Sequence, residues 1–472
     1  MTVPLEPAAG HSAGILPAQG AWFGHPPGLT VLFATEMWER FSYYGMRALL
    51  VLYMVGTLLQ PEHASNVVGL AALKSALESL SGPLEVQPFA SHIYGLYTGL
   101  VYLTPILGGL IADRWLGRRI TVIIGAGLMM AGHFLMANES LFLVALLLLI
   151  TGNGAFKPNI STQVGGLYAP DDARRDRAYS IFYVGINVGA FFSPLVCGTL
   201  GETYGWHTGF AAAGVGMLIG LAIYVMGASR LPADEVQLPL TSPSTMPTSS
   251  QTTTLAPALL ALLVLFVPSA LFWAAYEQQG NTIALWADGA LDRHVNLGFW
   301  NGDIPVTWFQ AINPLMIFAF TPPLVSWWAA RARSGQEPAT LSKLAMGCFG
   351  LSLGYLVLAY AAASNGVAPV SWLWLLAHFA IISIAELYFS PIGLSFVSQI
   401  APDKSRSLIM GLWLATSFTG NLFAGWLGSL WSHMPHATFF LTVAGIAACA
   451  GGIVALAQAP LARLLPDTAG RR

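Results

Sequence analysis

Seven charged side chains stand inside stretches of sequence that are otherwise apolar. Three are basic and four are acidic: Arg40, Arg47, Lys157, Glu36, Glu39, Glu277 and Glu386. If these stretches cross a membrane, each charge costs roughly 3 kcal/mol at the centre of the bilayer. Seven unpaired charges would cost on the order of 20 kcal/mol, more than the stability of a typical protein. They must therefore pair with one another or face water inside a bundle of helices.

Helical geometry places several of these charges on one face. At 100° per residue, Arg40 lies about 40° from Glu36, and Arg47 lies about 20° back from Arg40. Glu36, Arg40 and Arg47 thus form a polar stripe, with Glu39 about 60° to its side. The bases lie in the N-terminal half of the chain, and Glu277 and Glu386 lie in the C-terminal half.

This distribution of charge fits a zwitterion, whose carboxylate would meet the bases and whose ammonium would meet an acid. Three positive and four negative charges leave one excess negative charge, which a single bound proton neutralises. A desolvated glutamate is the natural proton carrier, first in the Glu36/Glu39 pair and second at Glu277. The competing interpretation is a set of static ion pairs that hold helices in register.

The elements that carry these charges are apolar runs long enough to cross a bilayer. The chain has 472 residues, of which 55% are hydrophobic and only 9% are charged, against about 25% charged in a soluble protein. A spanning helix needs about 20 apolar residues. We therefore predict an all-α integral membrane protein with twelve transmembrane helices in two six-helix bundles. The expected spans are 29–58, 91–112, 119–137, 140–166, 177–200, 206–228, 257–285, 305–330, 341–363, 370–399, 406–430 and 436–459.

Four segments differ from the spans. Residues 1–28 have no Lys, no Arg and no apolar core, so we expect a cytoplasmic tail and not a signal peptide. Residues 230–256 are rich in Pro, Ser and Thr, which predicts a flexible linker between an N-terminal bundle (29–229) and a C-terminal bundle (257–460). Residues 461–472 form the C-terminal tail. The loop 60–90 contains a pattern typical of a short amphipathic surface helix.

Lys and Arg in the loops predict the orientation. One set of loops and the C-terminal tail hold fifteen of these residues, and the opposite loops hold only Lys74 and Arg293. Because cytoplasmic loops carry the excess of positive charge, both termini are expected in the cytoplasm.

Other polar, aromatic and proline residues within the spans are candidates for a binding site. Asn187 and Asn313 are placed to hydrogen-bond a substrate or to bridge helices. Prolines such as Pro158, Pro314 and Pro391 can kink helices and open a cavity. Asp113 and Arg114, in a short loop with glycines on either side, are candidates for a hinge or gate. The aromatic candidates for a side-chain pocket are Tyr43, Tyr44, Tyr94, Tyr102, Trp273 and Trp413.

Motifs of other function classes do not occur in the sequence. It has no Walker A motif, no HExxH and no GxSxG, which argues against ATP-driven transport and against a membrane hydrolase. Cys197, Cys348 and Cys449 show no metal or redox spacing. We expect no enzyme activity, no metal and no cofactor, with protons as the coupling ion.

Seven segments, taken together and in order, resemble the proton-dependent oligopeptide transporter family of the major facilitator superfamily. The stretch EMWERFSYYG (36–45) is similar to the family's ExxER signature, and FYVGINVGA (182–190) is similar to its FYxxINxG signature. The other five segments are YLTPILGGLIADRWLGRR (102–119), GNGAFKPN (152–159), FWAAYEQQG (272–280), QAINP (310–314) and ELYFSPIGL (386–394).

The resemblance implies proton-driven import of di- and tripeptides by alternating access. Glu36, Glu39, Arg40 and Glu277 would couple proton movement to peptide binding, and Arg47 would pair with Glu277 to close the outer side. Lys157 would attract the peptide carboxylate together with Arg47, and would pair with Glu386 when the site is empty. Asn187, Asn313 and Glu386 would hold the amino terminus, while the pockets would be shaped by Tyr43, Tyr44, Tyr102, Trp273, Ser390 and Trp413.

The sequence departs from the family pattern in two ways. Bacterial members usually carry two further helices between the halves, but the segment 230–256 is too short and too polar to hold them. Animal members have a functional histidine in helix two, where this chain has Gly95, with His92 one turn earlier. The glutamates are therefore the better candidates for the proton carrier.

Two alternatives to peptide symport stay open at this stage. The first is a related transporter of another small anion or zwitterion, such as nitrate or a metabolite. The second is a membrane enzyme that uses the same cavity. The expected location is the bacterial inner membrane, and the expected partners are peptides, protons and lipid, with a monomer as the starting assumption.

Overall fold

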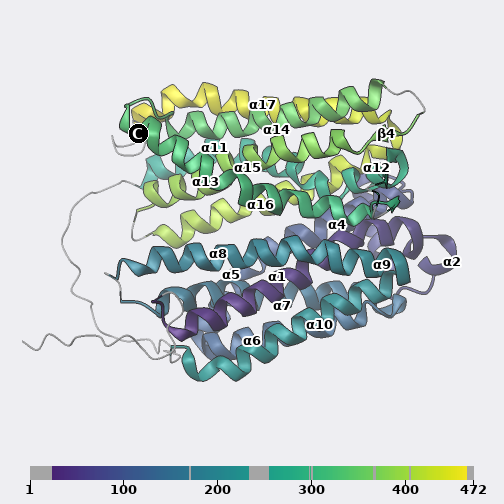
Figure 1. The fold of residues 1–472 in the computed structure, drawn as a ribbon, viewed down its shortest axis with the longest axis horizontal. Coiled ribbons are helices and arrows are strands. Elements are labelled where there is room, and N and C mark those ends of the chain that lie inside the picture. Colours follow the sequence, from purple (N-terminus) through teal and green to yellow (C-terminus); the bar gives the residue numbers. More distant parts are fainter. Residues whose placement is uncertain are drawn as a thin grey trace, which may run out of the picture.

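The structure is a computed structural model that describes residues 24–169, 172–232, 255–296, 298, 301–364, 368–402 and 405–464. Long helices run side by side along one axis (Figure 1). The first helix begins, and the last helix ends, at the same end of this array, which we call the terminal face; the opposite end is the far face. Most of the predicted tail 1–28 and linker 230–256 lies outside the described residues.

Two bundles are stacked in Figure 1, with the N-terminal helices in purple and blue below the C-terminal helices in green and yellow. The N-terminal bundle contains α1 (Pro27–Tyr53), α4 (Val86–Leu103), α5 (Pro105–Ile111), α6 (Gly117–Leu135), α7 (Phe142–Gly166), α8 (Arg174–Ser193), α9 (Thr199–Tyr204) and α10 (Trp206–Gly227). The C-terminal bundle contains α11 (Leu255–Tyr276), α12 (Thr282–Ala290), α13 (Ile312–Arg333), α14 (Thr340–Ser364), α15 (Leu373–Ile400), α16 (Arg406–Ser429) and α17 (His436–Leu464).

The helices account for the twelve predicted spans. Nine segments of the described chain are long and apolar enough to cross a membrane, and one of them, Val86–Leu135, contains two passes. Those two passes are separated by Gly117, whose φ of 73° allows a sharp turn that other residues rarely adopt. α1 and α13 are the remaining two passes, and α1 falls outside the nine-segment group because it carries four charges.

Three predicted spans are single helices in sequence but interrupted in the structure. Pro105 and Pro194 cannot donate a backbone hydrogen bond, and α4/α5 and α8/α9 are broken beside them. The predicted span 257–285 is also divided: α11 ends at Tyr276, a 3-10 turn covers Glu277–Gly280, and α12 begins at Thr282. The predicted seventh span is nevertheless one long membrane-crossing segment, Leu255–Ala290, which is interrupted at Glu277–Gly280. At the break, a side chain at Gly280 would collide with the Tyr94 hydroxyl, at 2.3 Å.

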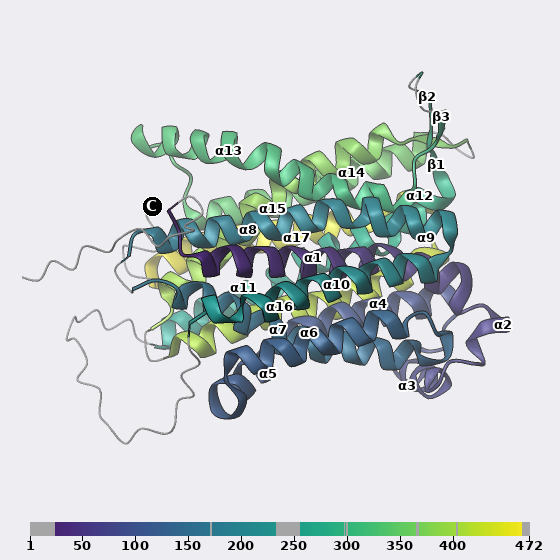
Figure 2. The ribbon, with the colours of Figure 1, turned by 60° about the horizontal axis from the view of Figure 1, so that its bottom comes forward.

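Small elements cover the far face. The predicted amphipathic surface helix is present as α3 (Leu70–Ser81), next to the short α2 (Pro61–Ala64). β2 (His294–Asn296) pairs antiparallel with β3 (Asn301–Asp303), and β1 (Leu291–Asp292) pairs in parallel with β4 (Val370–Ser371). Figure 2 shows the β2–β3 hairpin projecting from this end.

The two bundles meet mainly through α4 and α16. A Cβ atom added at Gly95 would lie 2.6 Å from the Asn421 carbonyl oxygen and 2.6 Å from the Gly425 Cα, so no side chain fits there. Gly95 is the position that the family resemblance aligns with the animal histidine. In this chain it is a point where α4 and α16 cross closely.

Candidate functional site

Two residues of the predicted stripe on α1, Glu36 and Arg40, form a buried cluster of charge with Glu39, while Arg47 has partners of its own. Arg40 forms ion pairs with both neighbouring acids: its Nε lies 3.4 Å from a Glu36 oxygen, and its guanidinium binds both oxygens of Glu39, one of them at 2.6 Å. The exposed fraction of all three side chains is 2% or less. Because one cation faces two carboxylates, the cluster has room for one added proton without losing its ion pairing.

α7 contributes a second basic group to this cluster. Asn153 donates a hydrogen bond of 3.2 Å to Glu39, and Lys157, one turn further along, interacts electrostatically with Glu36, Glu39 and Arg40. The second carboxylate oxygen of Glu36 is buried and has no hydrogen-bond partner among the described residues. A buried carboxylate oxygen without a partner is costly unless it is protonated or solvated, so Glu36 is the acid best placed to take up a proton.

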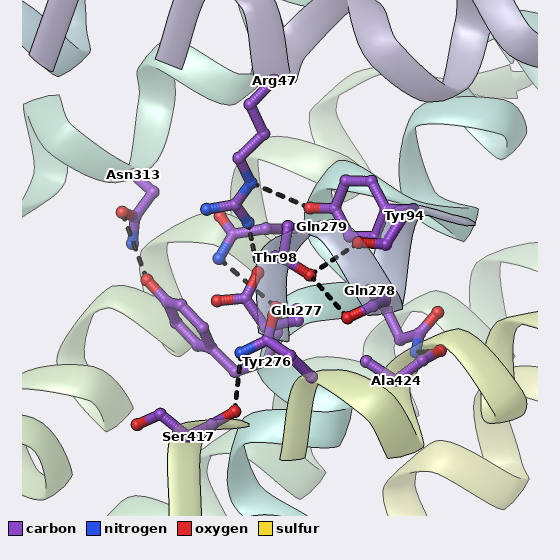
Figure 3. A network of polar contacts seen from close by, with 12 residues as sticks. Arg47, Tyr94, Thr98, Tyr276, Glu277, Gln278, Gln279, Asn313, Ser417 and Ala424 are labelled. Atoms are coloured by element: carbon purple, nitrogen blue, oxygen red, sulfur yellow. Dashed lines mark hydrogen bonds and ion pairs between the residues drawn. The ribbon is translucent and has the colours of Figure 1, made fainter. Parts of the chain in front are cut away.

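A second cluster joins the two bundles. Arg47 on α1 forms an ion pair with Glu277, and its Nε donates a hydrogen bond of 2.8 Å to the Tyr94 hydroxyl of α4 (Figure 3). Arg47 and Glu277 are 7% and 2% exposed. The pair that the resemblance implied is therefore present, and it lies at the break between α11 and α12, where the helix opens toward the N-terminal bundle.

The C-terminal bundle holds a third group of polar side chains around Glu386. One Glu386 oxygen accepts hydrogen bonds from the Tyr276 hydroxyl at 2.6 Å and from the Asn313 amide at 3.1 Å. Asn313 also donates to Ser383, at 3.0 Å. These contacts orient a carboxylate that is still partly exposed, as an acceptor for a bound ammonium must be.

Lys157 and Glu386 do not pair in this structure. Within the described part of the chain, Glu386 binds Tyr276 and Asn313 while Lys157 faces the α1 acids. The physical reason is the separation of their helices: α7 packs on helices of its own bundle, and α15 packs on α13, α14 and α16. The pairing implied for an empty site is absent from this conformation.

Aromatic rings line the region between these clusters. The Arg40 guanidinium lies 5.0 Å from the centre of the Tyr43 ring, and Arg47 lies 6.0 Å from the Tyr44 ring. In the other bundle, Phe389 packs between Trp273 and Trp413, with ring centres 6.3 and 6.4 Å away. Tyr43 and Tyr44 are thus next to charged groups, while Trp273 and Trp413 form an aromatic group with Phe389.

Among the other predicted residues, Tyr102 interacts electrostatically with Glu277 and Arg47. Asn187 donates to the Tyr183 carbonyl of its own helix, at 3.0 Å, while Tyr102 and Ser390 are half-buried. Asp113 and Arg114 are exposed in the turn after α5, where Asp113 lies 3.7 Å from Arg118. Pro391 is exposed within α15. The structure therefore does not bring the predicted gating residues to the charged centre.

Asn153 and Tyr276 belong to the site but were not among the predicted site residues. Asn153 lies within the segment around Lys157, and Tyr276 immediately precedes Glu277. In both places the neighbouring charged residue was predicted as a site residue, and the uncharged one was not. A buried amide one helical turn before a buried lysine was the available signal for Asn153. Nothing in the sequence distinguishes Tyr276 from the other tyrosines.

Comparisons with known proteins show which family this chain belongs to. A sequence model of the POT family matches residues 119–237 and 233–442. The chain belongs to the POT family. It is 34% identical to the peptide transporter YePEPT of Yersinia enterocolitica subsp. palearctica, over 97% of this chain and 98% of that protein.

Two further POT-family proteins show the same extent of likeness. A di-/tripeptide transporter of Lactococcus lactis subsp. cremoris is 31% identical, over 94% of this chain and 98% of its own. A solved structure of a mutant peptide transporter POT in complex with alafosfalin is 31% identical, with a TM-score of 0.80, over 95% of this chain and 98% of that chain. Similarity along the whole chain means that the membrane fold and all three polar clusters fall within the compared region.

Proposed function

We propose that this POT-family protein is a proton-coupled symporter that imports di- and tripeptides by alternating access. The observation that carries this proposal is the division of buried charge between the bundles. Arg40, Arg47 and Lys157 belong to the N-terminal bundle, and Glu277 and Glu386 belong to the C-terminal bundle. A zwitterion held between them contacts both bundles at once, so that its binding favours their closure.

Peptide termini are assigned to the two ends of this arrangement. Arg47 and Lys157 attract the peptide carboxylate, because both are cations next to the space between the bundles. Glu386, held by Tyr276 and Asn313, receives the ammonium, with Asn187 nearby as a further acceptor. Tyr43, Tyr44, Tyr102, Trp273, Ser390 and Trp413 shape the side-chain pockets, where aromatic faces accept varied side chains.

Proton coupling is assigned to the α1 cluster. Protonation of Glu36 removes its charge and leaves Arg40 fully paired with Glu39, so Lys157 is freed to bind the peptide carboxylate. Glu277 is the second proton site: its protonation would weaken the ion pair with Arg47 and allow the far side to open.

Charge in the loops supports the orientation. Arg118, Arg119, Arg174, Arg230 and Arg331 are all at the terminal face. By the positive-inside rule this face and both termini lie in the cytoplasm of a bacterial cell, and the chain acts as a monomer in the inner membrane. The hydrogen bonds and ion pairs described between the bundles lie in the half of the molecule near the far face. With the terminal face in the cytoplasm, these contacts close the outer side of the transporter.

The substrate class is tested by competition. Purified protein in proteoliposomes should take up labelled dialanine, and we expect unlabelled dipeptides and tripeptides to reduce this uptake while free amino acids do not. The reason for this expectation is that the termini of a peptide would bridge the cations of the N-terminal bundle and Glu386 of the C-terminal bundle, whereas a single amino acid is shorter. Uptake that nitrate or organic anions block, but peptides do not, would assign the site to another substrate.

A further inference from the structure

A glutamate at the far end of the N-terminal bundle reaches across to the C-terminal bundle. Glu202, on α9, accepts three hydrogen bonds from the turn that leads into α13. One of its oxygens accepts from the Val306 backbone N–H at 2.9 Å. The other accepts from the Thr307 backbone N–H at 2.9 Å and from the Thr307 hydroxyl at 2.6 Å.

The chain around Glu202 is shaped to permit this contact. A Cβ atom added at Gly198 would lie 1.9 Å from the Thr307 Oγ1, so the two bundles touch at this point without an intervening side chain. The Trp308 indole N–H donates a further hydrogen bond of 2.8 Å to the Thr199 hydroxyl. Four donors of one short turn, Val306–Ala311, are therefore satisfied by one short segment of the opposite bundle.

The chemistry of this contact is that of a helix cap supplied by another part of the chain. The first N–H groups of a helical segment have no partner within it, and a carboxylate satisfies them while also countering the positive end of the helix dipole. Hydrogen bonds to a charged acceptor are among the stronger ones in proteins. When the bundles separate at the far face, the start of this helical segment loses its cap.

We propose that Glu202 is a positioning residue for the transport cycle: it latches the far face closed by capping Val306 and Thr307 of the opposite bundle. This inference rests on the proposed alternating-access function, but the latch does not contact the peptide or proton groups. It is distinct from the Arg47–Glu277 pair, because it joins α9 to the start of α13 and not α1 to the end of α11. The latch therefore adds to the other contacts between the bundles in the far half, and it lies outside the charged centre.

Substitutions can weaken the latch in graded steps. Glu202→Gln keeps the size of the side chain but replaces one acceptor oxygen with a donor that faces the Val306 or Thr307 N–H. Thr307→Val removes one hydrogen bond and leaves both backbone donors in place. Glu139→Gln is the matched control, because Glu139 is also at the far face but pairs with His63 at 2.7 Å, within its own bundle.

The test measures the distance between the bundles at the far face. Spin labels are placed at Tyr204→Cys and Leu373→Cys, which are 73% and 55% exposed at the far ends of α9 and α15. Cys449→Ser removes the exposed native thiol, since Cys197 and Cys348 are buried. Pulsed electron-spin distances are then recorded for full-length protein in lipid, without peptide.

Glu202→Gln is expected to add a population with longer distances between the two labels. The ratio of this open population to the closed population should rise about tenfold, because one charge-assisted hydrogen bond is lost. Thr307→Val should give a smaller change, and Glu139→Gln none. Because more molecules then face outward, the apparent KM for external peptide should fall while the maximal rate does not rise. A distance distribution in Glu202→Gln equal to that of the unsubstituted protein would overturn the latch.

The two proposals fail in different ways. The distance measurement uses no peptide and therefore does not depend on the substrate. If the distances change as expected but the protein transports no peptide, the latch is supported and the proposed substrate is rejected. If Glu202→Gln protein does not fold, the Thr307→Val protein still gives the answer. An unchanged distance distribution in folded Thr307→Val protein would then contradict the latch.

Discussion

Tyr276 and Glu277 are neighbours in the chain, yet their side chains bind partners in opposite bundles. Glu277 pairs with Arg47 of the N-terminal bundle, and Tyr276 donates a hydrogen bond of 2.6 Å to Glu386 of the C-terminal bundle. Both residues lie at the point where α11 ends (Figure 3). A change at this break therefore acts on the closing ion pair and on the predicted ammonium site together.

Tyr276→Phe should weaken peptide binding. It removes a hydrogen bond to a carboxylate, which leaves Glu386 less well oriented, and we expect about a tenfold rise in the KM for dialanine uptake. Tyr355→Phe is the control: its hydroxyl also donates at 2.6 Å, but to the Ala275 carbonyl, away from Glu386. Equal KM values for the two variants would show that Tyr276 does not position the acid.

Glu277→Gln should impair both transport and stability. It leaves Arg47 buried and without its ionic partner, and breaking a buried pair in this way costs roughly 3–5 kcal/mol. Thermal unfolding in detergent should therefore occur at a lower temperature, and uptake should fall strongly. The exchanged pair Arg47→Glu with Glu277→Arg should recover part of the thermal stability. No recovery in the exchanged protein would mean that the residues act separately.

Gly95→Ala should disturb the crossing of α4 and α16. An added methyl group would lie 2.6 Å from backbone atoms of α16, so the bundles could not close fully at the far face. Uptake should fall by about tenfold or more, since the helices must move apart. Gly127→Ala on α6 meets no atom within 4 Å and should retain full uptake. A Gly95→Ala protein with normal uptake would rule out this crossing as a requirement for closure.

The pH dependence of uptake should not come from the loop between α7 and α8. Arg174 hydrogen-bonds the Asp172 carboxylate through its side chain and its backbone N–H, and lowers the pKa of Asp172 from 3.8 to about 2. A lowered pKa means that the contact is present above the ordinary pKa and is lost only as the pH falls toward 2. Asp172→Asn should therefore leave the pH profile of uptake unchanged between about pH 5 and 8. A shifted profile would contradict this assignment.

Sequence reasoning predicted the parts of the site that depend on periodicity and charge. Glu36, Arg40 and Arg47 share a face because a helix repeats its direction every few residues, and a buried charge in an apolar run requires a partner. The contacts of Tyr276 and Glu202 could not be predicted in this way. Each is a common residue type whose role depends on the approach of a segment far away in the chain, and no proline marks the break after Tyr276.

The central claim is that proton binding on α1 drives peptide accumulation, and uptake into proteoliposomes tests it most directly. Labelled dialanine is offered with an inward proton gradient, which a protonophore then removes, for the unsubstituted protein and for Glu36→Gln. We expect accumulation that is lost with the protonophore. Glu36→Gln should show no accumulation but should still exchange peptide by counterflow, because the carboxylate-binding cations are intact. Accumulation of peptide against its gradient by Glu36→Gln, or by unsubstituted protein with the protonophore present, would contradict the account.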